Sequence, residues 1–478
     1  MNYKMICYTL GCVLNIEAAC MILPLICSII YRDGCTNTFL LSIIICLIFG
    51  ILLSFRVPKK KNMYAKEGFV TVALSWIVIS IFGALPFYLS GYIPNYVDAL
   101  FETVSGFTTT GATILKDVEA LSKSMLFWRS FTHWIGGMGV LVFLVAILPL
   151  SGGGNMHLIR AESPGPAVGK LVPKVRQTAK ILYGIYIAFT LIQIILLLFG
   201  GMSVFEALTL SFGTAGTGGF APTNASIAQY SSYAQIVITV FMLIFGVDFS
   251  IYYLLLNRQF KVALRTEEFR AYFLIVFGSV ILVSINCFNL FGNLFETIKH
   301  SAFQVASIIT TTGYSTVDFD LWPTFSKTII VMLMFCGACA GSTGGGVKVS
   351  RLLVLAKSII REIKIAAHPR ITTKITLNKR TIEHETVRRI NVFMAAYIAI
   401  FFISLLVISF DNLDFTTNFT AIAATINNVG PGLAKVGPAQ NFAVYSPLSK
   451  LVMSFDMLVG RLEVFPILVM LSPTSWKK

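Results

Sequence analysis

Apolar runs long enough to cross a bilayer recur along the whole chain. They cover 5–31, 38–56, 69–92, 125–149, 179–200, 233–256, 269–291, 325–360, 389–410 and 447–471. Because an α-helix needs about 20 apolar residues to cross the hydrocarbon core, each run predicts a membrane span. The pattern predicts an all-α polytopic membrane protein with ten spans.

Four shorter apolar runs lie between spans, and each ends at a glycine turn. They cover 98–109, 204–215, 295–311 and 415–428, and the turns read TTTGA, GTGGF, TTTGY and NNVGP. A unit of span, half-length helix, turn and span therefore occurs four times, after two extra N-terminal spans. The predicted divisions are a two-helix extension over 1–66 and four pseudo-symmetric helix–pore-helix–filter–helix repeats over 67–176, 177–266, 267–386 and 387–478.

The glycine turns suit a cation that has lost its water. Non-helical backbone at membrane depth needs a partner for its carbonyl groups, and a ring of carbonyl oxygens can replace the hydration shell of an ion. Glycine permits the torsions of such a turn. Close helix packing by small residues would explain any one such turn, but it explains poorly four of them, each between a half-length helix and a full span. The predicted filter residues are Thr109, Thr110, Gly111, Thr217, Gly218, Thr311, Thr312, Gly313, Asn428, Val429 and Gly430.

The absence of charge from these turns indicates the ion. No Asp or Glu stands at the glycine of any turn or beside it. Calcium-selective pores use rings of carboxylates, whereas a neutral backbone filter suits potassium. We therefore expect K⁺ as the transported ion.

The eighth apolar run is too long for one span and is interrupted by glycines. The interruption covers 336–347 and predicts an intramembrane loop below the filter that acts as a gate. Arg461 lies deep in the last span, where it is expected to pair with Glu463, Asp456 or loop carbonyls and to repel cations. The predicted gate residues are Gly341, Ser342, Thr343, Gly344, Gly345, Gly346 and Arg461.

Two further charged residues stand near these segments. We interpret Lys348 as an ordinary interfacial cation. Asp248 falls within the sixth predicted span, where an internal hydrogen bond is expected, but the sequence assigns it no role.

Composition and charge agree with a membrane protein and give its orientation. Hydrophobic residues make up 56% of the 478 residues, charged residues 12%, and the mean hydropathy is +0.79, values that exclude an ordinary soluble domain. The net charge of +15 is spread over short loops without interleaved aromatics, which argues against nucleic-acid binding. The basic clusters follow alternate spans: Arg56, Lys59, Lys60, Lys61 and Lys66; Arg160, Lys170, Lys174, Arg176 and Lys180; Arg258, Lys261, Arg265 and Arg270; and Arg361, Lys364, Arg370, Lys374, Lys379, Arg380, Arg388 and Arg389, with Lys477 and Lys478 at the end.

The positive-inside rule places these loops and both termini in the cytoplasm, so the half-length helices enter from outside. Carboxylates stand near the outer starts of those helices. Two interpretations remain open for them, as partners of the helix dipoles or as a negative vestibule that concentrates cations. They are Asp98, Glu102, Glu206, Glu296, Asp411 and Asp414.

Other chemistry has little support in the sequence. The nine cysteines, including the pair Cys336 and Cys339, are interpreted as small buried hydrophobes, and no histidine pattern predicts a metal site. Glu17 interrupts the first apolar run, so that run is expected to be a retained helix instead of a signal peptide. An intramembrane enzyme would need a catalytic pair, and His133 stands alone, so no enzymatic activity is expected.

Three stretches resemble a known family. They are FETVSGFTTTGAT with HWIGGMGVLVF, then CAGSTGGGVKVSR, and finally NNVGPGLAKVGP through GRLEVFPILVM. Together they resemble the TrkH/KtrB superfamily of potassium uptake proteins over essentially the whole chain, and the N-terminal pair of spans is more similar to the TrkH branch. Asp248-Phe249 departs from an Asn-Phe pair common there, and Thr217 stands before the second glycine where an aliphatic residue is often found.

The resemblance implies a gated potassium pore in each protomer of a homodimer in a bacterial inner membrane. It implies that Gly111, Gly218, Gly313 and Gly430 are the filter glycines and that Arg461 is the arginine of the last helix. It also implies a cytoplasmic ring of nucleotide-binding regulatory subunits; this chain has no nucleotide motif of its own, and membrane lipid is its other expected partner. A proton- or sodium-coupled potassium symporter is the alternative, although such folds usually carry inverted repeats.

Overall fold

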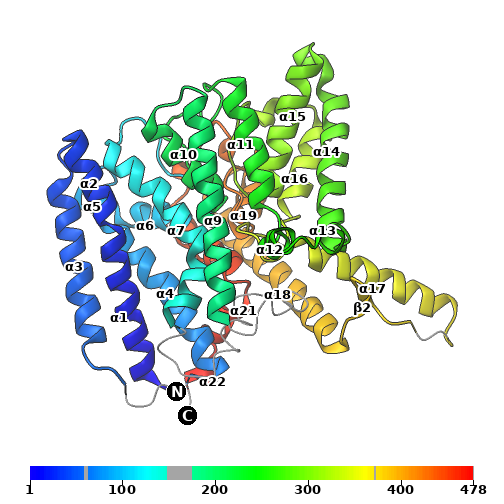
Figure 1. Cartoon of the computed structure of the whole chain (residues 1–478), viewed down its shortest axis with the longest axis horizontal. Coiled ribbons are helices and arrows are strands. Elements are labelled where there is room, and N and C mark those ends of the chain that lie inside the picture. Colours follow the sequence, from blue (N-terminus) through cyan, green and yellow to red (C-terminus); the bar gives the residue numbers. More distant parts are fainter. Residues whose placement is uncertain (59–62, 148–174, 371–372, 477–478) are drawn as a thin grey trace.

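The structure is a computed structural model that describes residues 1–58, 63–147, 175–370 and 373–476, with side chains for all of these except 138–147 and 175–179 (Figure 1). The helices and strands in chain order are α1 (Tyr3–Cys20), α2 (Ile22–Tyr31), α3 (Thr36–Ser54), α4 (Ala65–Gly83), α5 (Leu85–Leu89), α6 (Tyr96–Phe107), α7 (Lys123–Ile147), α9 (Val175–Phe199), α10 (Val204–Gly216), α11 (Ser232–Phe245), α12 (Phe249–Leu256), α13 (Phe260–Leu264), α14 (Glu267–Phe291), α15 (Leu294–Ile309), α16 (Thr324–Met334), α17 (Val349–Ala367), β1 (Thr376–Leu377), β2 (Arg380–Thr381), α18 (His384–Ile408), α19 (Phe415–Ile426), α20 (Pro447–Arg461), α21 (Phe465–Leu471) and α22 (Pro473–Trp476). Short 3₁₀ turns cover Phe319–Leu321, Ser409–Asp411, Ala434–Val436 and Phe442–Val444.

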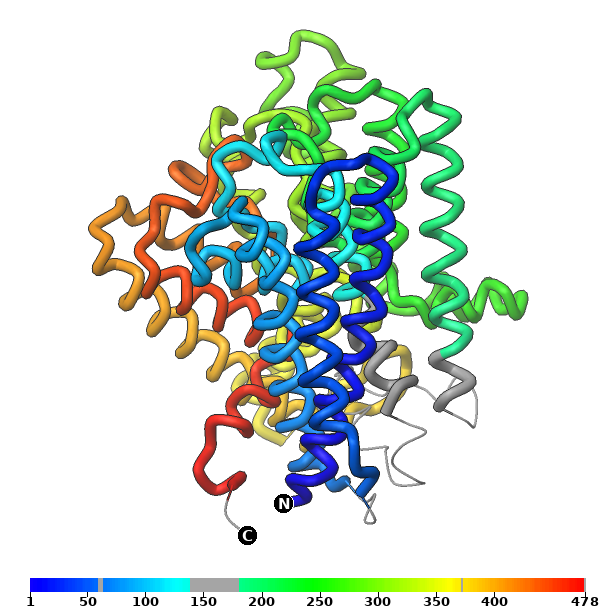
Figure 2. Tube along the Cα trace, turned by 90° about the vertical axis from the view of Figure 1, so that its left-hand side faces the viewer, coloured from blue at the N-terminus to red at the C-terminus, as the bar shows by residue number. Residues whose placement is uncertain are grey.

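The N-terminal helices form a pair along one side of the bundle. α1 and α2 together make a 29-residue apolar run that packs antiparallel to α3, as the blue segments of Figures 1 and 2 show. Glycines let the backbones come close, since a Cβ on Gly11 would lie 2.6 Å from the carbonyl oxygen of Gly50. The first predicted run is thus a helix that packs in the bundle.

Four half-length helices, α6, α10, α15 and α19, lie where the sequence predicts them. They have 12, 13, 16 and 12 residues, too few to cross a bilayer. Each begins at a side chain whose oxygen accepts a hydrogen bond from a backbone N–H of the first turn, which fixes the start of the helix. These capping residues are Asn95, Ser203, Asn293 and Asp414.

The described residues contain six helices long and apolar enough to span a membrane, or seven if α11 and α12 count as one. The straight sixth span predicted over 233–256 is wrong, because α12 turns away from α11 by 91° and runs sideways from the bundle (Figure 2, green). The predicted eighth and tenth spans are also discontinuous: α16 ends at Met334 before the loop, and α20 ends at Arg461. The end of the fourth predicted span, 148–149, lies outside the described residues.

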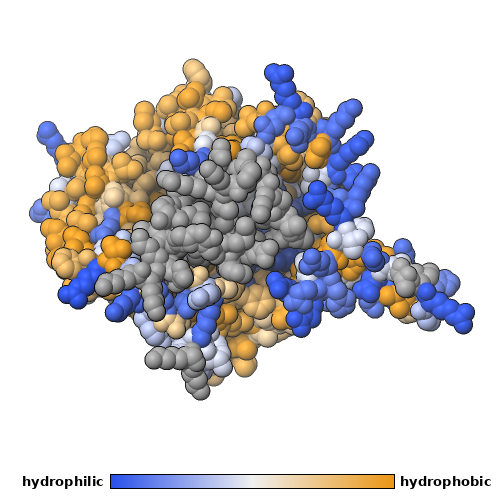
Figure 3. Space-filling view, turned by 60° about the horizontal axis from the view of Figure 1, so that its bottom comes forward, coloured by the Kyte–Doolittle hydropathy of each residue, from blue (hydrophilic) through white to orange (hydrophobic). Residues whose placement is uncertain are grey.

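α17, the β1–β2 hairpin and the start of α18 form an arm that projects from the bundle (Figure 1). Seen from the end that carries both termini, the arm is largely hydrophilic, whereas hydrophobic residues cover the opposite flank (Figure 3). Both termini lie at this end, where the Tyr3 hydroxyl donates to the Trp476 carbonyl oxygen at 3.0 Å. Several predicted basic residues lie outside the part of the chain whose side chains are described, namely Lys59, Lys60, Lys61, Arg160, Lys170, Lys174, Arg176, Lys477 and Lys478.

Candidate functional site

The four glycine turns share one backbone conformation. In each, a residue one or two positions after the last helical residue is left-handed, and a glycine with positive φ follows two residues later. A positive φ is uncommon outside glycine, so its repetition at four polar residues marks one structural motif. The φ values are 55° at Thr109, 54° at Thr217, 57° at Thr311 and 55° at Asn428, and then 81° at Gly111, 77° at Gly219, 80° at Gly313 and 100° at Gly430.

Each turn also has the same hydrogen bond across its helix end. The amide between the left-handed residue and the glycine donates to the carbonyl oxygen five residues earlier, as in the Schellman motif that ends many helices. The pairs are Thr110 to Ser105 at 2.9 Å, Gly218 to Gly213 at 2.8 Å, Thr312 to Ser307 at 2.8 Å and Val429 to Ala424 at 2.8 Å. The turn conformation is therefore encoded at the end of each pore helix.

The turns close into a ring through contacts between backbone atoms. A Cβ on Gly111 would lie 2.0 Å from the Gly218 carbonyl oxygen, and one on Gly219 would lie 2.0 Å from that of Thr312. The circuit continues from Gly313 to the Val429 oxygen at 2.2 Å, and from Gly430 to the Thr110 oxygen at 2.7 Å. Since real Cβ atoms do not come so close, glycine is required at each position. The order first, second, third, fourth and back to first is that of a four-membered ring.

This geometry corrects one predicted residue. The sequence reading took Gly218 as the glycine equivalent to Gly111, but Gly219 has the positive φ and the contact with the next turn. Gly218 occupies the preceding position, with Thr110, Thr312 and Val429. Aligning the letters TGG of the second turn with TTG of the first and third turns places Gly219 at the position of Gly111 and Gly313.

Hydroxyl and amide side chains support the ring from behind. The hydroxyls of Thr108 and Thr110 lie 2.8 Å apart, and Asn428 Nδ2 donates to Thr110 Oγ1 at 3.0 Å across the contact between the fourth and first turns. The predicted filter residues Thr109, Thr110, Thr217, Thr311, Thr312, Asn428 and Val429 are all fully buried. The structure thus brings together the turns that lie far apart in sequence.

The interruption at 336–347 is a closed loop directly against the ring. The Gly337 amide donates to the Val347 carbonyl oxygen at 2.7 Å and closes its neck. At its tip, the Gly345 amide donates to Thr311 Oγ1 at 2.8 Å, and a Cβ on Gly345 would lie 2.7 Å from that of Asn428. The tip therefore lies beside the third and fourth filter turns.

Charged side chains hold this loop. Glu268 of α14 accepts from the amide of Ala340 within the loop at 2.7 Å and from that of Ser350 at the start of α17 at 3.0 Å. Lys348 is 6% exposed, and its Nζ donates to the carbonyl oxygens of Gly344 and Gly345. The interpretation of Lys348 as an interfacial cation is wrong, because its ammonium group turns back into the loop.

Arg461 reaches the loop from α20. One guanidinium nitrogen donates to the Thr343 carbonyl oxygen at 2.8 Å and the other to that of Gly136 on α7 at 2.6 Å. Of the three kinds of partner expected for Arg461, the loop carbonyl is therefore present. Glu463 forms an ion pair with Arg351, and Asp456 accepts from the Ser404 hydroxyl at 2.7 Å.

Asp248 lies at the break between α11 and α12, next to the loop. It caps α12 by accepting from the Ser250 amide at 2.8 Å and from the Ser250 hydroxyl. A Cβ on Gly341 would lie 2.6 Å from its Oδ1, and the Phe249 amide donates to the Gly341 carbonyl oxygen at 3.2 Å. Asp is a common N-cap residue, so Asp248 within the apolar run is itself a signal for a helix start, which the prediction of one continuous span over 233–256 does not use.

The carboxylates near the starts of the four half-length helices are engaged in caps and ion pairs. Glu206 completes a capping box with Ser203. Hydrogen bonds from the Thr417 hydroxyl and amide hold the pKa of the Asp414 carboxyl below its usual range. These contacts favour the dipole and capping interpretation of the acidic residues. The remaining contacts are Asp98 with Lys450 at 2.7 Å, Glu102 with Arg129 at 2.6 Å, Glu296 with Lys299 at 2.6 Å, and Asp411 with the Ser446 amide at 2.9 Å.

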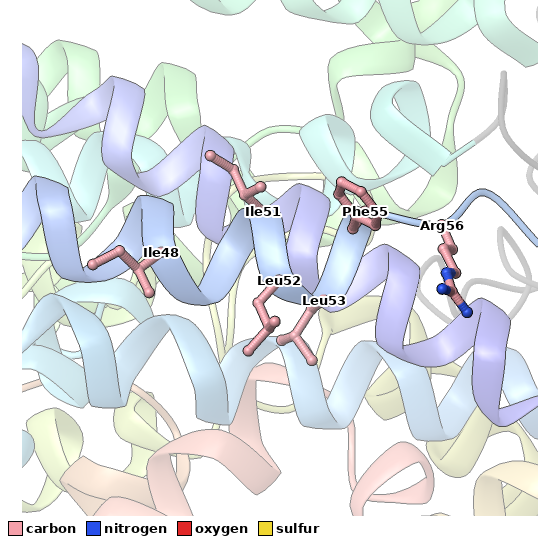
Figure 4. Close-up of a pocket in the computed structure, with 6 residues that line it drawn as sticks. All are labelled: Ile48, Ile51, Leu52, Leu53, Phe55 and Arg56. Carbon is pink, nitrogen blue, oxygen red and sulfur yellow. The ribbon is translucent and has the colours of Figure 1, made fainter.

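Metal sites and pockets are the other places in the described residues where chemistry could occur, away from the ring and the loop. They contain no group of three or more His, Cys, Asp or Glu side chains arranged to hold a metal ion. A shallow pocket lies at the end of α3 and is lined by Ile48, Ile51, Leu52, Leu53, Phe55 and Arg56 (Figure 4). None of these residues belongs to the ring or the loop.

Comparisons with known proteins agree with this arrangement. A family model described as cation transport protein, TrkH, matches residues 36–478. The chain is 38% identical to the Trk system potassium uptake protein TrkH of Escherichia coli K12 and 30% identical to TrkG of the same strain, over 100% of this chain and 100% and 99% of theirs. A crystal structure of the potassium transporter TrkH from Vibrio parahaemolyticus superimposes with a TM-score of 0.89 at 33% identity, covering 100% of both chains. The predicted all-α membrane fold and the resemblance are thereby confirmed, and the chain belongs to the TrkH family of cation transport proteins.

Proposed function

We propose that this protein takes up potassium through the ring of four glycine turns, with backbone carbonyl oxygens as the ligands of the dehydrated ion. The observation that supports this most strongly is the closed circuit of glycine-to-carbonyl contacts, from Gly111 around to Gly430. Four turns of the same backbone conformation in one closed ring supply the oxygen-rich site that K⁺ requires. The pore helices end at this ring, so their negative dipole ends favour a cation there.

The filter residues in this proposal are those of the corrected register. They are Thr109, Thr110 and Gly111; Thr217, Gly218 and Gly219; Thr311, Thr312 and Gly313; and Asn428, Val429 and Gly430. No carboxylate belongs to these turns, which fits a monovalent ion. The relatives in the comparisons are named potassium uptake proteins, which agrees with this choice of ion.

The loop and Arg461 form the gate in this proposal. Gly341, Ser342, Thr343, Gly344, Gly345 and Gly346 lie in the loop, whose tip bonds to Thr311. Arg461 adds a positive charge at Thr343 that raises the energy of a cation on the path below the ring. Opening then requires the loop and the guanidinium to separate from the ring.

The location, orientation and assembly in this proposal rest on membership of the TrkH family. We assign the protein to a bacterial inner membrane, with cytoplasmic termini, the four predicted repeats around the pore, and a homodimeric assembly. A cytoplasmic nucleotide-binding ring would act on the end of the molecule that carries the hydrophilic arm (Figure 3).

Rubidium flux into proteoliposomes tests the proposal. The purified protein is expected to carry ⁸⁶Rb⁺ down its gradient, with K⁺ but not Na⁺ competing. Equal competition by Na⁺ would contradict a potassium filter. An absolute requirement for a proton or sodium gradient would replace the pore with a coupled symporter.

A further inference from the structure

The second filter turn lacks side chains that the first and third turns have. Two threonine hydroxyls lie 2.8 Å apart in each of those turns, Thr108 with Thr110 and Thr310 with Thr312. The two matching positions in the second turn are Gly216 and Gly218, and Gly219 follows. Three glycines among four residues make this backbone the least restrained of the four by its own side chains.

His133 of α7 fills the space that these glycines leave. A Cβ on Gly218 would lie 2.3 Å from both Cγ and Nδ1 of the imidazole, and one on Gly216 would lie 2.2 Å from the His133 carbonyl oxygen. The imidazole is fully buried. The side chain missing from the second turn is thus replaced by one from a different helix.

Both ring nitrogens of His133 are used. Nδ1 lies 2.8 Å from the Gly106 carbonyl oxygen, and the Phe220 amide donates to Nε2 at 3.2 Å. A carbonyl oxygen can only accept and a backbone amide can only donate, so the imidazole is neutral with its proton on Nδ1. The ring therefore connects the end of the first pore helix to the residue after Gly219.

Arg129, one turn earlier on α7, extends this connection. Its guanidinium lies 3.5 Å from the centre of the Phe220 ring. The His133 imidazole also packs on this ring, with 4.2 Å between the two ring centres. Arg129 also pairs with Glu102 at 2.6 Å and donates to the Ala221 carbonyl oxygen at 3.1 Å. Two side chains of α7, Arg129 and His133, therefore hold Phe220 in place.

We propose that His133 is a positioning residue that sets the ion selectivity of the second filter turn. The peptide unit is planar, so fixing the Phe220 N–H fixes the direction of the Gly219 carbonyl on the other side of the same bond. Without the acceptor at Nε2, this peptide can rotate at the flanking glycine, and one of the four ligand positions loses its geometry. The inference rests on the proposed function, because it treats the ring as the filter.

Three substitutions at one position separate positioning from packing. His133→Leu removes both hydrogen bonds. His133→Gln keeps an acceptor near the Nε2 position, whereas His133→Asn keeps only a donor near the Nδ1 position. Tyr186→Phe is the matched control, since it removes the hydrogen bond of 3.2 Å that the Tyr186 hydroxyl donates to the Trp134 carbonyl oxygen on α7 and leaves both His133 hydrogen bonds in place.

The measurement is the ratio of ⁸⁶Rb⁺ to ²²Na⁺ flux in proteoliposomes, which a merely destabilised protein does not change. We expect a fall of about tenfold in this ratio for Leu and Asn, and a ratio near wild type for Gln and for Tyr186→Phe. A wild-type ratio in His133→Asn, or in His133→Leu, contradicts the inference. If the Leu variant does not fold, the Asn and Gln pair decides.

Hydrogen exchange makes the inference independent of flux. The Phe220 amide, followed in the peptide covering 214–222, should exchange faster in His133→Asn than in His133→Gln. Equal protection in the two variants would overturn the positioning role even in a protein that conducts. A wild-type protein with no preference for Rb⁺ would contradict the proposed function and leave the exchange result to judge His133 alone.

Discussion

The ring of four glycine turns and the loop at 336–347 are both glycine-rich, non-helical and largely buried, but they are held in different ways. Each turn of the ring is fixed by a backbone hydrogen bond to its own pore helix, such as Thr312 to Ser307 at 2.8 Å. The loop is held mainly by charged side chains, namely Lys348 directly after it, Glu268 of α14 and Arg461 of α20, in addition to the backbone bond that closes its neck. A single hydrogen bond, from Gly345 to Thr311, joins the two among the contacts described for the loop tip.

This difference separates what is rigid from what can move. Each turn of the ring is hydrogen-bonded to the end of its own helix, so opening the ring breaks a helix cap at every turn that moves. Side-chain anchors break when the elements that carry them shift, and a hydrogen bond to a charged group contributes about 1.5–3 kcal/mol. We therefore expect changes in the ring to alter selectivity and changes in the loop to alter the rate of flux.

The largest effect is expected at a ring glycine. Gly313→Ser places a Cβ only 2.2 Å from the Val429 carbonyl oxygen, and it does so at a φ of 80°, a backbone conformation that favours glycine. The ratio of Rb⁺ to Na⁺ flux should fall by about tenfold or more, which is about 1.4 kcal/mol of discrimination. Unchanged selectivity in a folded variant would remove Gly313 from the filter.

The next effect is expected from shortening the loop. Deleting 338–345 removes the tip and its bond to Thr311, together with the Thr343 carbonyl that binds Arg461. Rb⁺ flux should rise, by about tenfold if the loop contributes about 1.4 kcal/mol to the barrier, and the Rb⁺ to Na⁺ ratio should stay. The same or lower flux in a well-folded protein would count against a gate.

A smaller effect is expected at the anchor on α14. Glu268→Gln replaces a charged acceptor for the Ala340 and Ser350 amides with a neutral one, and a neutral hydrogen bond is weaker by about 1 kcal/mol. Flux should rise about threefold to fivefold without a change in selectivity. Glu385→Gln, at the exposed start of α18, is the control, and an equal rise there would refute a specific role for Glu268.

The smallest effect is expected at Asp248. Asp248→Asn keeps a capping oxygen for the Ser250 amide but removes the charge beside Gly341. Because Asn is also a good cap, flux should change by less than about twofold. A large change would instead give this carboxylate a direct part in the gate.

Hydrophobic patterning predicted much of this molecule because it reports elements that the chain encodes locally. Runs of bilayer length predicted the six helices of the described residues that are long and apolar enough to span a membrane, and the half-length helices end at the predicted turns, as α6 and α19 show. The predicted loop lies against the ring. Patterning did not predict the 91° bend at Asp248, since the apolar run continues through it.

What the sequence did not predict depends on contacts between distant segments. The contact of Gly219 with the Thr312 carbonyl oxygen shows which glycine of the second turn is equivalent to Gly111. The sequence TGG offers two adjacent glycines and does not distinguish them. The sequence places Lys348 directly after the loop, which suggests an interfacial cation, but it does not give the direction of the side chain. The role of His133 beside Gly218 depends on the packing of α7 against α10, which no local pattern contains.

The most direct test of the separation between ring and loop is the flux of Arg461→Ala in proteoliposomes, measured with ⁸⁶Rb⁺ and ²²Na⁺ on the same preparation. Arg461 binds the loop at Thr343 without belonging to a filter turn. We predict a higher Rb⁺ flux with the wild-type ratio of Rb⁺ to Na⁺. A ratio that falls as the flux rises, or a flux that does not change, would contradict the account.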